Sequence, residues 1–100
     1  MQIMVNPKAA QWFKEEVGLN EGFGIRFKTR IYGKSPINDG FTIGIEPDQP
    51  LNPIASTVTD NGVLFFIEEN DQWYFEGYDL IVDFDEKLHE PKYVYKKYKL

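Results

Sequence analysis

The feature that most constrains the fold is an alternation of apolar and polar residues that occurs twice in the first half of the chain. Residues 23–31 place phenylalanine, isoleucine or threonine at every second position, with glycine, arginine or lysine between them. Residues 41–46 repeat the pattern. Because successive side chains of a strand point to opposite faces of a sheet, this period predicts two half-buried strands. Residues 30–40 then form the loop that joins these strands as antiparallel neighbours, and Pro47 is expected to end the second strand because it lacks a donor for the ladder.

One amphipathic helix is predicted near the start of the chain. Asn6 can accept a hydrogen bond from an early helix amide, and Pro7 suits the first helical turn, where its missing N–H costs nothing. The apolar residues that follow recur at helical spacing, at Ala9, Ala10, Phe13 and Val17. We expect this helix to end near Gly18 and to pack on a sheet.

The second half of the chain predicts further short strands. Asn61-Gly62 is typical of a tight hairpin turn and links residues 57–59 to residues 63–67, which are apolar on both faces and so indicate a central strand. Residues 48–56 are expected to be an irregular connection, residues 70–75 a short helical turn, and residues 80–85 a strand. An edge strand or loose tail follows at residues 93–98. The aromatic residues Trp73, Tyr74, Phe75 and Tyr78 are expected to serve as core and sheet cover.

These elements together predict a small, mainly β fold in one domain that spans residues 1–100. A chain of 100 residues buries roughly 60–70% of its extended surface on folding, which suffices for one core. The expected architecture is two short sheets, packed as a sandwich or a partly closed barrel, with the N-terminal helix packed on one side.

Composition excludes several classes of function. The chain has no cysteine, so it has no disulfide, zinc–thiolate site or thiol nucleophile of its own. Its net charge of −5 disfavours nucleic-acid binding. A membrane span needs about 20 apolar residues, and the apolar runs here are far shorter, so we expect a cytoplasmic protein with no membrane partner. A single histidine without a serine partner motif, and no glycine-rich phosphate loop, give no support to an enzyme.

Two groups of charged residues are candidate binding sites. Arg26, Lys28 and Arg30 share one strand face and could form a cationic patch for an anionic ligand or an acidic partner, although such a face is more often simply solvated. Asp83, Asp85 and His89 offer two carboxylates and one imidazole, which suit a divalent metal ion. Charged residues in loops are usually solvated, however, so these three are weak metal candidates.

The order of elements resembles the HesB-like core domain, the family of A-type iron–sulfur cluster carriers, over nearly the whole chain. The similarity is carried by the Asn-Pro helix start, the glycine-containing loop Tyr32-Gly33-Lys34-Ser35, the Asn-Gly hairpin and the stretch WYFEGYDLIVDF. The resemblance implies that Gly33, Lys34 and Ser35 occupy the family's ligand loop, with Lys34 where the family has a cysteine. The Cys-Gly-Cys tail of the family has no counterpart here.

The missing cysteines change what this resemblance implies about function. Iron in a sulfide cluster is held by soft thiolates, and a lysine, with a reference pKa of about 10.4, is protonated near neutrality and cannot replace them. Iron or a cluster is therefore expected only if a partner supplies cysteines. The resemblance implies an accessory protein of iron–sulfur cluster assembly, with a protein partner from that pathway and a homodimer or higher homo-oligomer. The alternative is an interaction or regulatory module that binds no metal and has kept the fold.

Overall fold

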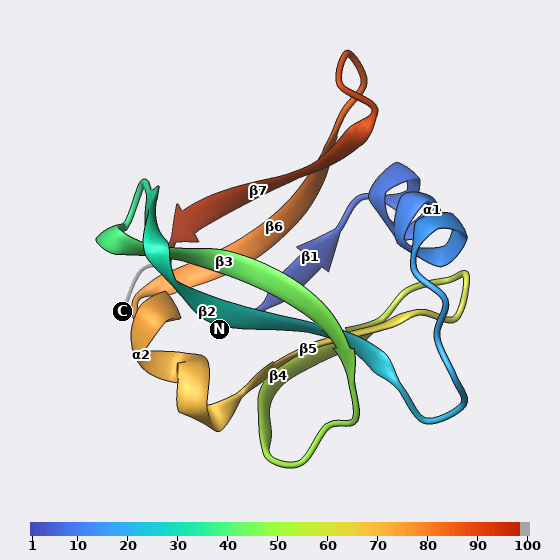
Figure 1. The fold of residues 1–100 in the computed structure, drawn as a ribbon, viewed down its shortest axis with the longest axis horizontal. Coiled ribbons are helices and arrows are strands. Elements are labelled where there is room, and N and C mark those ends of the chain that lie inside the picture. The colour runs from blue at the N-terminus through green and yellow to red at the C-terminus, as the bar shows by residue number, and fades with distance from the viewer. Residues whose placement is uncertain (99–100) are drawn as a thin grey trace.

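The structure consists of two β-sheets with helices packed against them (Figure 1). The computed structural model describes residues 1–98, apart from the side chains of Tyr32 and Asp39. In chain order the elements are β1 (Ile3–Val5), α1 (Pro7–Glu16), β2 (Gly24–Ser35), β3 (Asn38–Asp48), β4 (Pro53–Val58), β5 (Leu64–Glu68), the 3-10 helix η1 (Glu69–Asp71), α2 (Gln72–Phe75), β6 (Tyr78–Asp85) and β7 (Glu90–Lys97).

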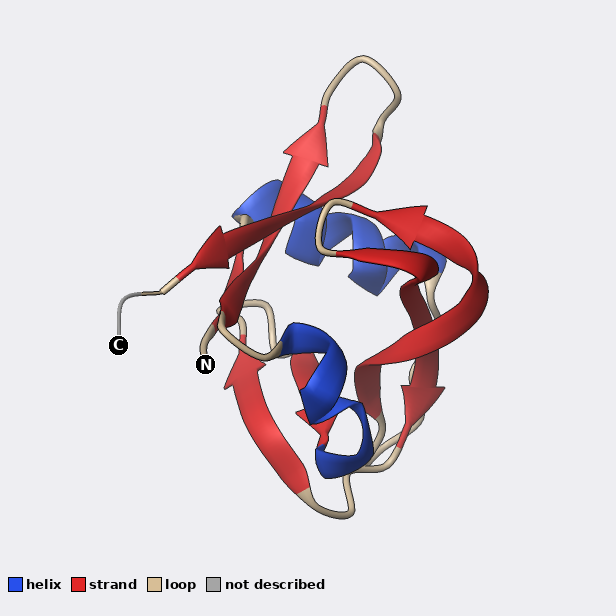
Figure 2. Ribbon diagram, turned by 90° about the vertical axis from the view of Figure 1, so that its left-hand side faces the viewer, coloured by secondary structure: helices blue, strands red, loops and turns tan. Residues whose placement is uncertain are grey.

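The predicted mainly β fold with an N-terminal helix is confirmed. One sheet has the strand order β1-β6-β7 and the other the order β3-β2-β5-β4. The two sheets of residues 1–98 do not close into a barrel. Figure 2 shows the longer helix α1 and the shorter helical segment lying apart from each other, each against the strands. Among the described residues no helix is long and apolar enough to cross a membrane.

Helix α1 forms where the sequence predicts it. The Asn6 Oδ1 atom accepts a hydrogen bond of 2.8 Å from the Lys8 amide, and Pro7 is the first helical residue. Ala9, Ala10 and Phe13 are buried. The Phe13 ring meets the Phe65 ring of β5 edge to face, with 5.2 Å between their centroids. The apolar face of the helix thus completes the core, to which β2, β5 and β6 contribute Ile25, Phe27, Phe65, Ile67, Leu80 and Val82.

The Asn-Gly hairpin and the central strand are also confirmed. Strand β4 pairs antiparallel with β5, and Gly62 takes a φ of 86° in the turn between them. That φ lies in the left-handed region, which glycine adopts without the steric penalty of a Cβ. Strand β5 lies between β2 and β4, and its residues Phe65, Phe66 and Ile67 are fully buried. Burial of consecutive residues means that both faces of β5 are covered, as its apolar sequence predicts.

The structure corrects three predicted boundaries. Residues 30–40 are not a loop, because β2 continues to Ser35 and β3 begins at Asn38, with a register shift between Ile31 and Lys34. Pro47 does not end its strand but pairs with Ile25. Strand β3 is an edge strand, where the missing proline N–H is tolerated. Residues 48–56 are not wholly irregular, since β4 starts within them.

Strand β1 is absent from the sequence-based prediction. It pairs in parallel with β6, and the amides of Leu80 and Asn6 donate to the carbonyls of Gln2 and Val82 at 2.9 and 2.8 Å. A run of three residues is too short to show an alternation. Its partner lies far away in the sequence, so only the folded chain forms this strand.

Two tyrosines of β7 contribute to the core. The Tyr93 ring packs against Phe27 with 5.9 Å between their centroids, and the hydroxyls of Tyr95 and Tyr74 lie 2.9 Å apart. Burial, assisted by the charge of Glu90, raises the pKa of Tyr93 to about 12. Burial and the Tyr74 hydrogen bond also raise the pKa of Tyr95. Both groups therefore resist ionisation in the folded chain.

We expect the protein to lose stability at alkaline pH. An unfolded tyrosine titrates near pH 10, so the unfolded state loses this proton before Tyr93 does in the folded state, with its pKa of about 12. The stabilisation is complete below about pH 10, and the loss from Tyr93 alone approaches about 3 kcal/mol as the pH rises towards 12. Urea unfolding followed by circular dichroism between pH 8 and 11.5 would measure this loss. The Tyr93→Phe variant should show a shallower decline, because it lacks this ionisable hydroxyl while the other tyrosines remain. Parallel declines would contradict the prediction.

Candidate interaction surface

The cationic strand face predicted from the sequence contains a partly buried ion pair. The Arg26 guanidinium donates to Asp48 Oδ2 at 3.0 Å and to Asp71 Oδ2 at 3.1 Å, and its side chain is only 20% exposed. Burial by itself would lower the pKa of Arg26, but the hydrogen bonds that Arg26 donates to the two carboxylates, together with their charges, outweigh it and raise that pKa. The hydrogen bond from Arg26, followed by that from the Gln49 amide, lowers the pKa of Asp48. Arg26 is thus paired with carboxylates of its own chain.

Asp71 also completes the hydrogen bonding of β2. Strand β5 pairs with β2 only at Ile25 and Arg26. Beyond its last residue, Glu68, the chain continues into η1. The Asp71 Oδ1 atom accepts a hydrogen bond of 3.1 Å from the Thr29 amide, at the β2 edge that β5 no longer covers. One carboxylate therefore fixes η1, and with it α2, to the sheet through a backbone amide and a guanidinium.

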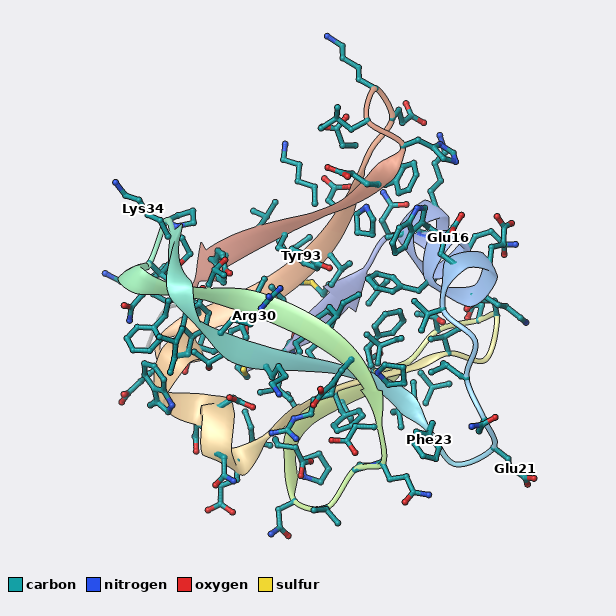
Figure 3. The ribbon with its side chains drawn as sticks, in the orientation of Figure 1. Glu16, Glu21, Phe23, Arg30, Lys34 and Tyr93 are labelled. Carbon is teal, nitrogen blue, oxygen red and sulfur yellow. The ribbon has the colours of Figure 1, made fainter. Side chains whose placement is uncertain are left out.

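The other two residues of the predicted cationic face differ in their surroundings. Lys28 Nζ lies 3.3 Å from Glu46 Oε1. Arg30 has no ion-pair partner among the described side chains. It lies over Gly44, where an added Cβ would come within 2.2 Å of the Arg30 Cδ atom, and Figure 3 shows it in front of the sheet. The structure thus pairs Arg26 and Lys28 with carboxylates and leaves Arg30 at the surface.

Gly33, Lys34 and Ser35 lie at the end of β2 and not in an open ligand loop. An added Cβ at Gly33 would come within 2.5 Å of the Thr42 Cγ2 atom, so glycine is needed for the close approach of β3. Ser35 Oγ donates to the Asn38 carbonyl at 3.4 Å across the turn. Lys34 is exposed near the end of the hairpin (Figure 3). Packing of the β2–β3 hairpin accounts for the glycine of this motif.

Two of the predicted metal candidates accept hydrogen bonds instead, Asp83 from the residue that caps α1 and Asp85 within the turn after β6. Asp83 Oδ1 accepts from Asn6 Nδ2 at 3.0 Å and from the Phe84 amide at 2.9 Å, and the Phe84 amide is the larger cause of a lowered Asp83 pKa. Asp85 Oδ1 accepts from the amides two and three residues later. His89 takes a φ of 53°, and its ring lies against Phe84. Within residues 1–98 the structure brings no group of three potential ligands together to hold a metal ion.

A cavity of about 530 Å³ lies between β1, the start of α1 and the β4–β5 turn. Ile3, Met4, Val5, Pro7 and Ala10 form its apolar side, and Asp60 is the one charged residue in the lining. The lining therefore presents no pair of groups with which to transfer a proton or activate a nucleophile.

An exposed aromatic surface comes from three separate elements and was missed by the sequence analysis. Trp73 of α2 is 50% exposed and Ile31 of β2 is 66% exposed. Ile31 is paired with Phe41 across the β2–β3 ladder, and the Phe41 ring meets the Trp73 ring edge to face, with 5.1 Å between their centroids. We call Ile31, Phe41 and Trp73 the Trp73 surface. Contiguous exposed apolar patches often form protein interaction sites, so the Trp73 surface is a candidate for one.

The sequence predicts burial for these residues, and the structure explains the difference. Tyr74 and Phe75 are buried as predicted, but Trp73 faces outward. Ile31 shares a strand face with the buried Ile25 and Phe27, yet it lies on the part of β2 that β5 does not pair with. The alternation identifies the face of a strand but not where the covering layer ends.

An open hollow adjoins Trp73. It measures about 630 Å³ and is lined by Glu69, Asn70, Gln72, Trp73 and Glu76. Two carboxylates and no cation face this hollow. Neither Glu69 nor Glu76 has an ion-pair partner among the described side chains.

Comparison with known proteins identifies relatives that this chain matches over their full length. The chain is 38% identical over 96 residues to the pyruvate dehydrogenase inhibitor of Bacillus subtilis (strain 168), and this match covers 96% of the chain and all of that protein. It is also 32% identical over 98 residues to an uncharacterised protein of Staphylococcus saprophyticus and 30% identical over 103 residues to one of Staphylococcus haemolyticus. These matches cover 96% and 99% of the chain and all of each relative. No family model matches the chain.

These findings overturn the assignment to the HesB-like family. The named relative is a pyruvate dehydrogenase inhibitor and not an iron–sulfur assembly protein, and no family model supports the resemblance. The predicted role in cluster assembly is wrong for the same reason, as is the predicted partner from that pathway. Short motifs and an order of elements carried the resemblance, whereas the relative matches along its whole length. The chain belongs to the family of the B. subtilis pyruvate dehydrogenase inhibitor.

Proposed function

We propose that this protein is a regulatory protein that binds and inhibits pyruvate dehydrogenase without catalysing a reaction itself. The observation that carries the proposal is the 38% identity to the B. subtilis inhibitor, which extends over all of that relative. Of the two functions considered from the sequence, the interaction or regulatory module is the one that this relative supports.

The surface of the protein is consistent with action through contact. An inhibitor of this kind needs an exposed surface that can bury against its target, and the Trp73 surface offers Ile31 and Trp73 at 66% and 50% exposure. Tryptophan is enriched among the few residues that dominate binding at protein interfaces. We propose a cytoplasmic location for this activity. The predicted homodimer or higher homo-oligomer stays a prediction, which light scattering of the purified protein would test.

We expect the purified protein to lower the rate of pyruvate oxidation by B. subtilis pyruvate dehydrogenase. Inhibition by binding should saturate as the ratio of protein to enzyme rises, and it should reverse on dilution, because no covalent change is made. The assay is a titration of enzyme activity against protein concentration, followed by a dilution step. The B. subtilis inhibitor serves as the positive control.

Two outcomes would contradict this proposal in different ways. Unchanged enzyme activity in an excess of the protein, while the B. subtilis inhibitor acts, would overturn the assigned target. Inhibition that grows with time at a small fraction of the enzyme concentration, and that persists on dilution, would indicate catalytic modification and overturn the non-enzymatic role.

A further inference from the structure

We propose that the Trp73 surface and its adjoining hollow dock a basic segment of pyruvate dehydrogenase, with a lysine or arginine side chain over the indole of Trp73. This inference rests on the proposed function and names the surface and the chemistry of the contact. It draws on the rigidity of Trp73, the charge of the hollow and the apolar neighbours of the indole.

Trp73 is held in place although half of it is exposed. Its ring packs edge to face on Phe41 and on Tyr74, at centroid distances of 5.1 and 6.0 Å. Tyr74 is buried, and its hydroxyl lies 2.9 Å from that of Tyr95. The residue just before α2, Asp71, is fixed to β2 by its bonds to Arg26 and Thr29. A side chain ordered before binding loses less entropy in the complex.

The charge of the hollow selects a cation. Glu69 and Glu76 line it together with Trp73, and the remaining lining residues, Asn70 and Gln72, are uncharged. A guanidinium or ammonium over the indole would interact with the negative face of the ring and with these carboxylates at once. Neither Glu69 nor Glu76 has an ion-pair partner among the described side chains, so both carboxylates are available to a cation in the hollow.

The apolar part of the surface favours a polypeptide over a small cation. Ile31 and Phe41 extend from Trp73 onto the β2–β3 hairpin, so a chain whose basic side chain lies over the indole can place an apolar neighbour on them. Apolar contact supplies affinity, and charge complementarity supplies specificity and a faster association. The fitting occupant is a segment in which a lysine or arginine is accompanied by an apolar residue.

Three variants test this proposal. Trp73→Ala removes the indole, and the double variant Glu69→Lys/Glu76→Lys reverses the charge of the hollow. The double variant Glu16→Lys/Glu21→Lys is the matched control. It makes the same charge change at two exposed positions. Figure 3 shows Glu16 on α1 and Glu21 in the loop before β2, both on the opposite side of the view from α2, which Figure 1 labels. Circular dichroism confirms that each variant is folded.

Calorimetric binding to B. subtilis pyruvate dehydrogenase and inhibition of its activity are measured for every variant. We expect Trp73→Ala to weaken binding about 30-fold, as for a dominant interface residue. Charge reversal at Glu69 and Glu76 should weaken binding about 10-fold or more at low salt, with a smaller difference at high salt, since salt screens exposed charges. The affinity of the control should stay within about 3-fold of that of the natural protein. Charges far from the interface act on the enzyme only at long range, where salt screens them.

The possible outcomes separate this proposal from the proposed function. If the natural protein binds and inhibits, and the Trp73 and hollow variants do so equally well, the docking surface is wrong while the function stands. If the control loses as much affinity as the Glu69 and Glu76 variant, overall charge decides binding and the hollow does not. If the natural protein neither binds nor inhibits, the proposed function is overturned, and this enzyme is excluded as the occupant of the surface.

Discussion

Replacement of Phe65 by alanine is expected to lower the free energy of unfolding by about 3–5 kcal/mol, the range typical of phenylalanine truncations in a core. Phe65 is fully buried in the central strand β5. Its ring meets Phe13 of α1 edge to face at 5.2 Å and stacks on Phe27 of β2 at 5.8 Å. One side chain therefore joins the helix to two neighbouring strands, and its loss would leave a cavity where all three meet.

This loss is large for a chain of this size. A native domain is stable by about 5–15 kcal/mol, so the variant could lose a third or more of its stability. Urea unfolding followed by circular dichroism would measure the difference. Leu51→Ala is the control, because Leu51 is 83% exposed and a surface truncation should change stability by no more than about 0.5 kcal/mol. A difference below about 1 kcal/mol for Phe65→Ala would show that Phe65 is not at the centre of the core.

Replacement of Asp71 by alanine is expected to lower the free energy of unfolding by about 2–3 kcal/mol, because it leaves a partly buried amide and a partly buried cation short of acceptors. The Thr29 amide loses its side-chain acceptor, and Arg26 keeps only its pairing with Asp48 and, at 4.0 Å, with Glu46. Asp71 is buried with its side chain 11% exposed, so water replaces these contacts poorly.

Two comparison variants separate the contributions of Asp71. Asp71→Asn keeps an oxygen that can accept from Thr29 but removes the charge that faces Arg26, so it should cost less than alanine. Asp48→Ala removes the other partner of Arg26 at a more exposed position, 38% for the side chain, and should cost about 1 kcal/mol or less. Equal costs for Asp71→Ala and Asp48→Ala in urea unfolding would contradict the assigned double role of Asp71.

The Asp71 variant also has a functional consequence. Asp71 directly precedes α2, so loosening it should disorder the segment that presents Trp73. If the Trp73 surface docks the enzyme, Asp71→Ala should weaken inhibition although Asp71 lies outside the hollow. Asp48→Ala, at the end of β3, should leave inhibition close to that of the natural protein.

The regulatory role that the named relative supports was predicted from the sequence only as an alternative, and the reason is chemical. A binding surface has no spacing rule of the kind that metal ligands or phosphate loops have. The Gly33-Lys34-Ser35 motif resembled a ligand loop, yet its glycine is accounted for by the close approach of Thr42. Asp83 and Asp85 resembled metal ligands, yet they accept hydrogen bonds from Asn6 and from backbone amides. Residue types with several common uses do not identify one of them.

The sequence by itself determined the elements whose signals are local. Asn6 and Pro7 determined the start of α1, Gly62 the turn between β4 and β5, and the apolar run of residues 63–67 the central strand. In each case the deciding contact lies within a few residues, or the burial of a whole segment follows from its composition.

Only the tertiary structure decided which residues of those elements remain exposed and which charges are paired. Strand β1 exists because β6 lies beside it, and Arg26 is bound because Asp71 arrives from η1. These contacts join positions far apart in the chain. Ile31 and Trp73 remain exposed although Ile25 and Phe27 on the same strand face, and Tyr74 and Phe75 on the same helix, are buried. Hydrophobic burial favours covering every apolar residue, and which ones stay uncovered depends on where the sheets end in space.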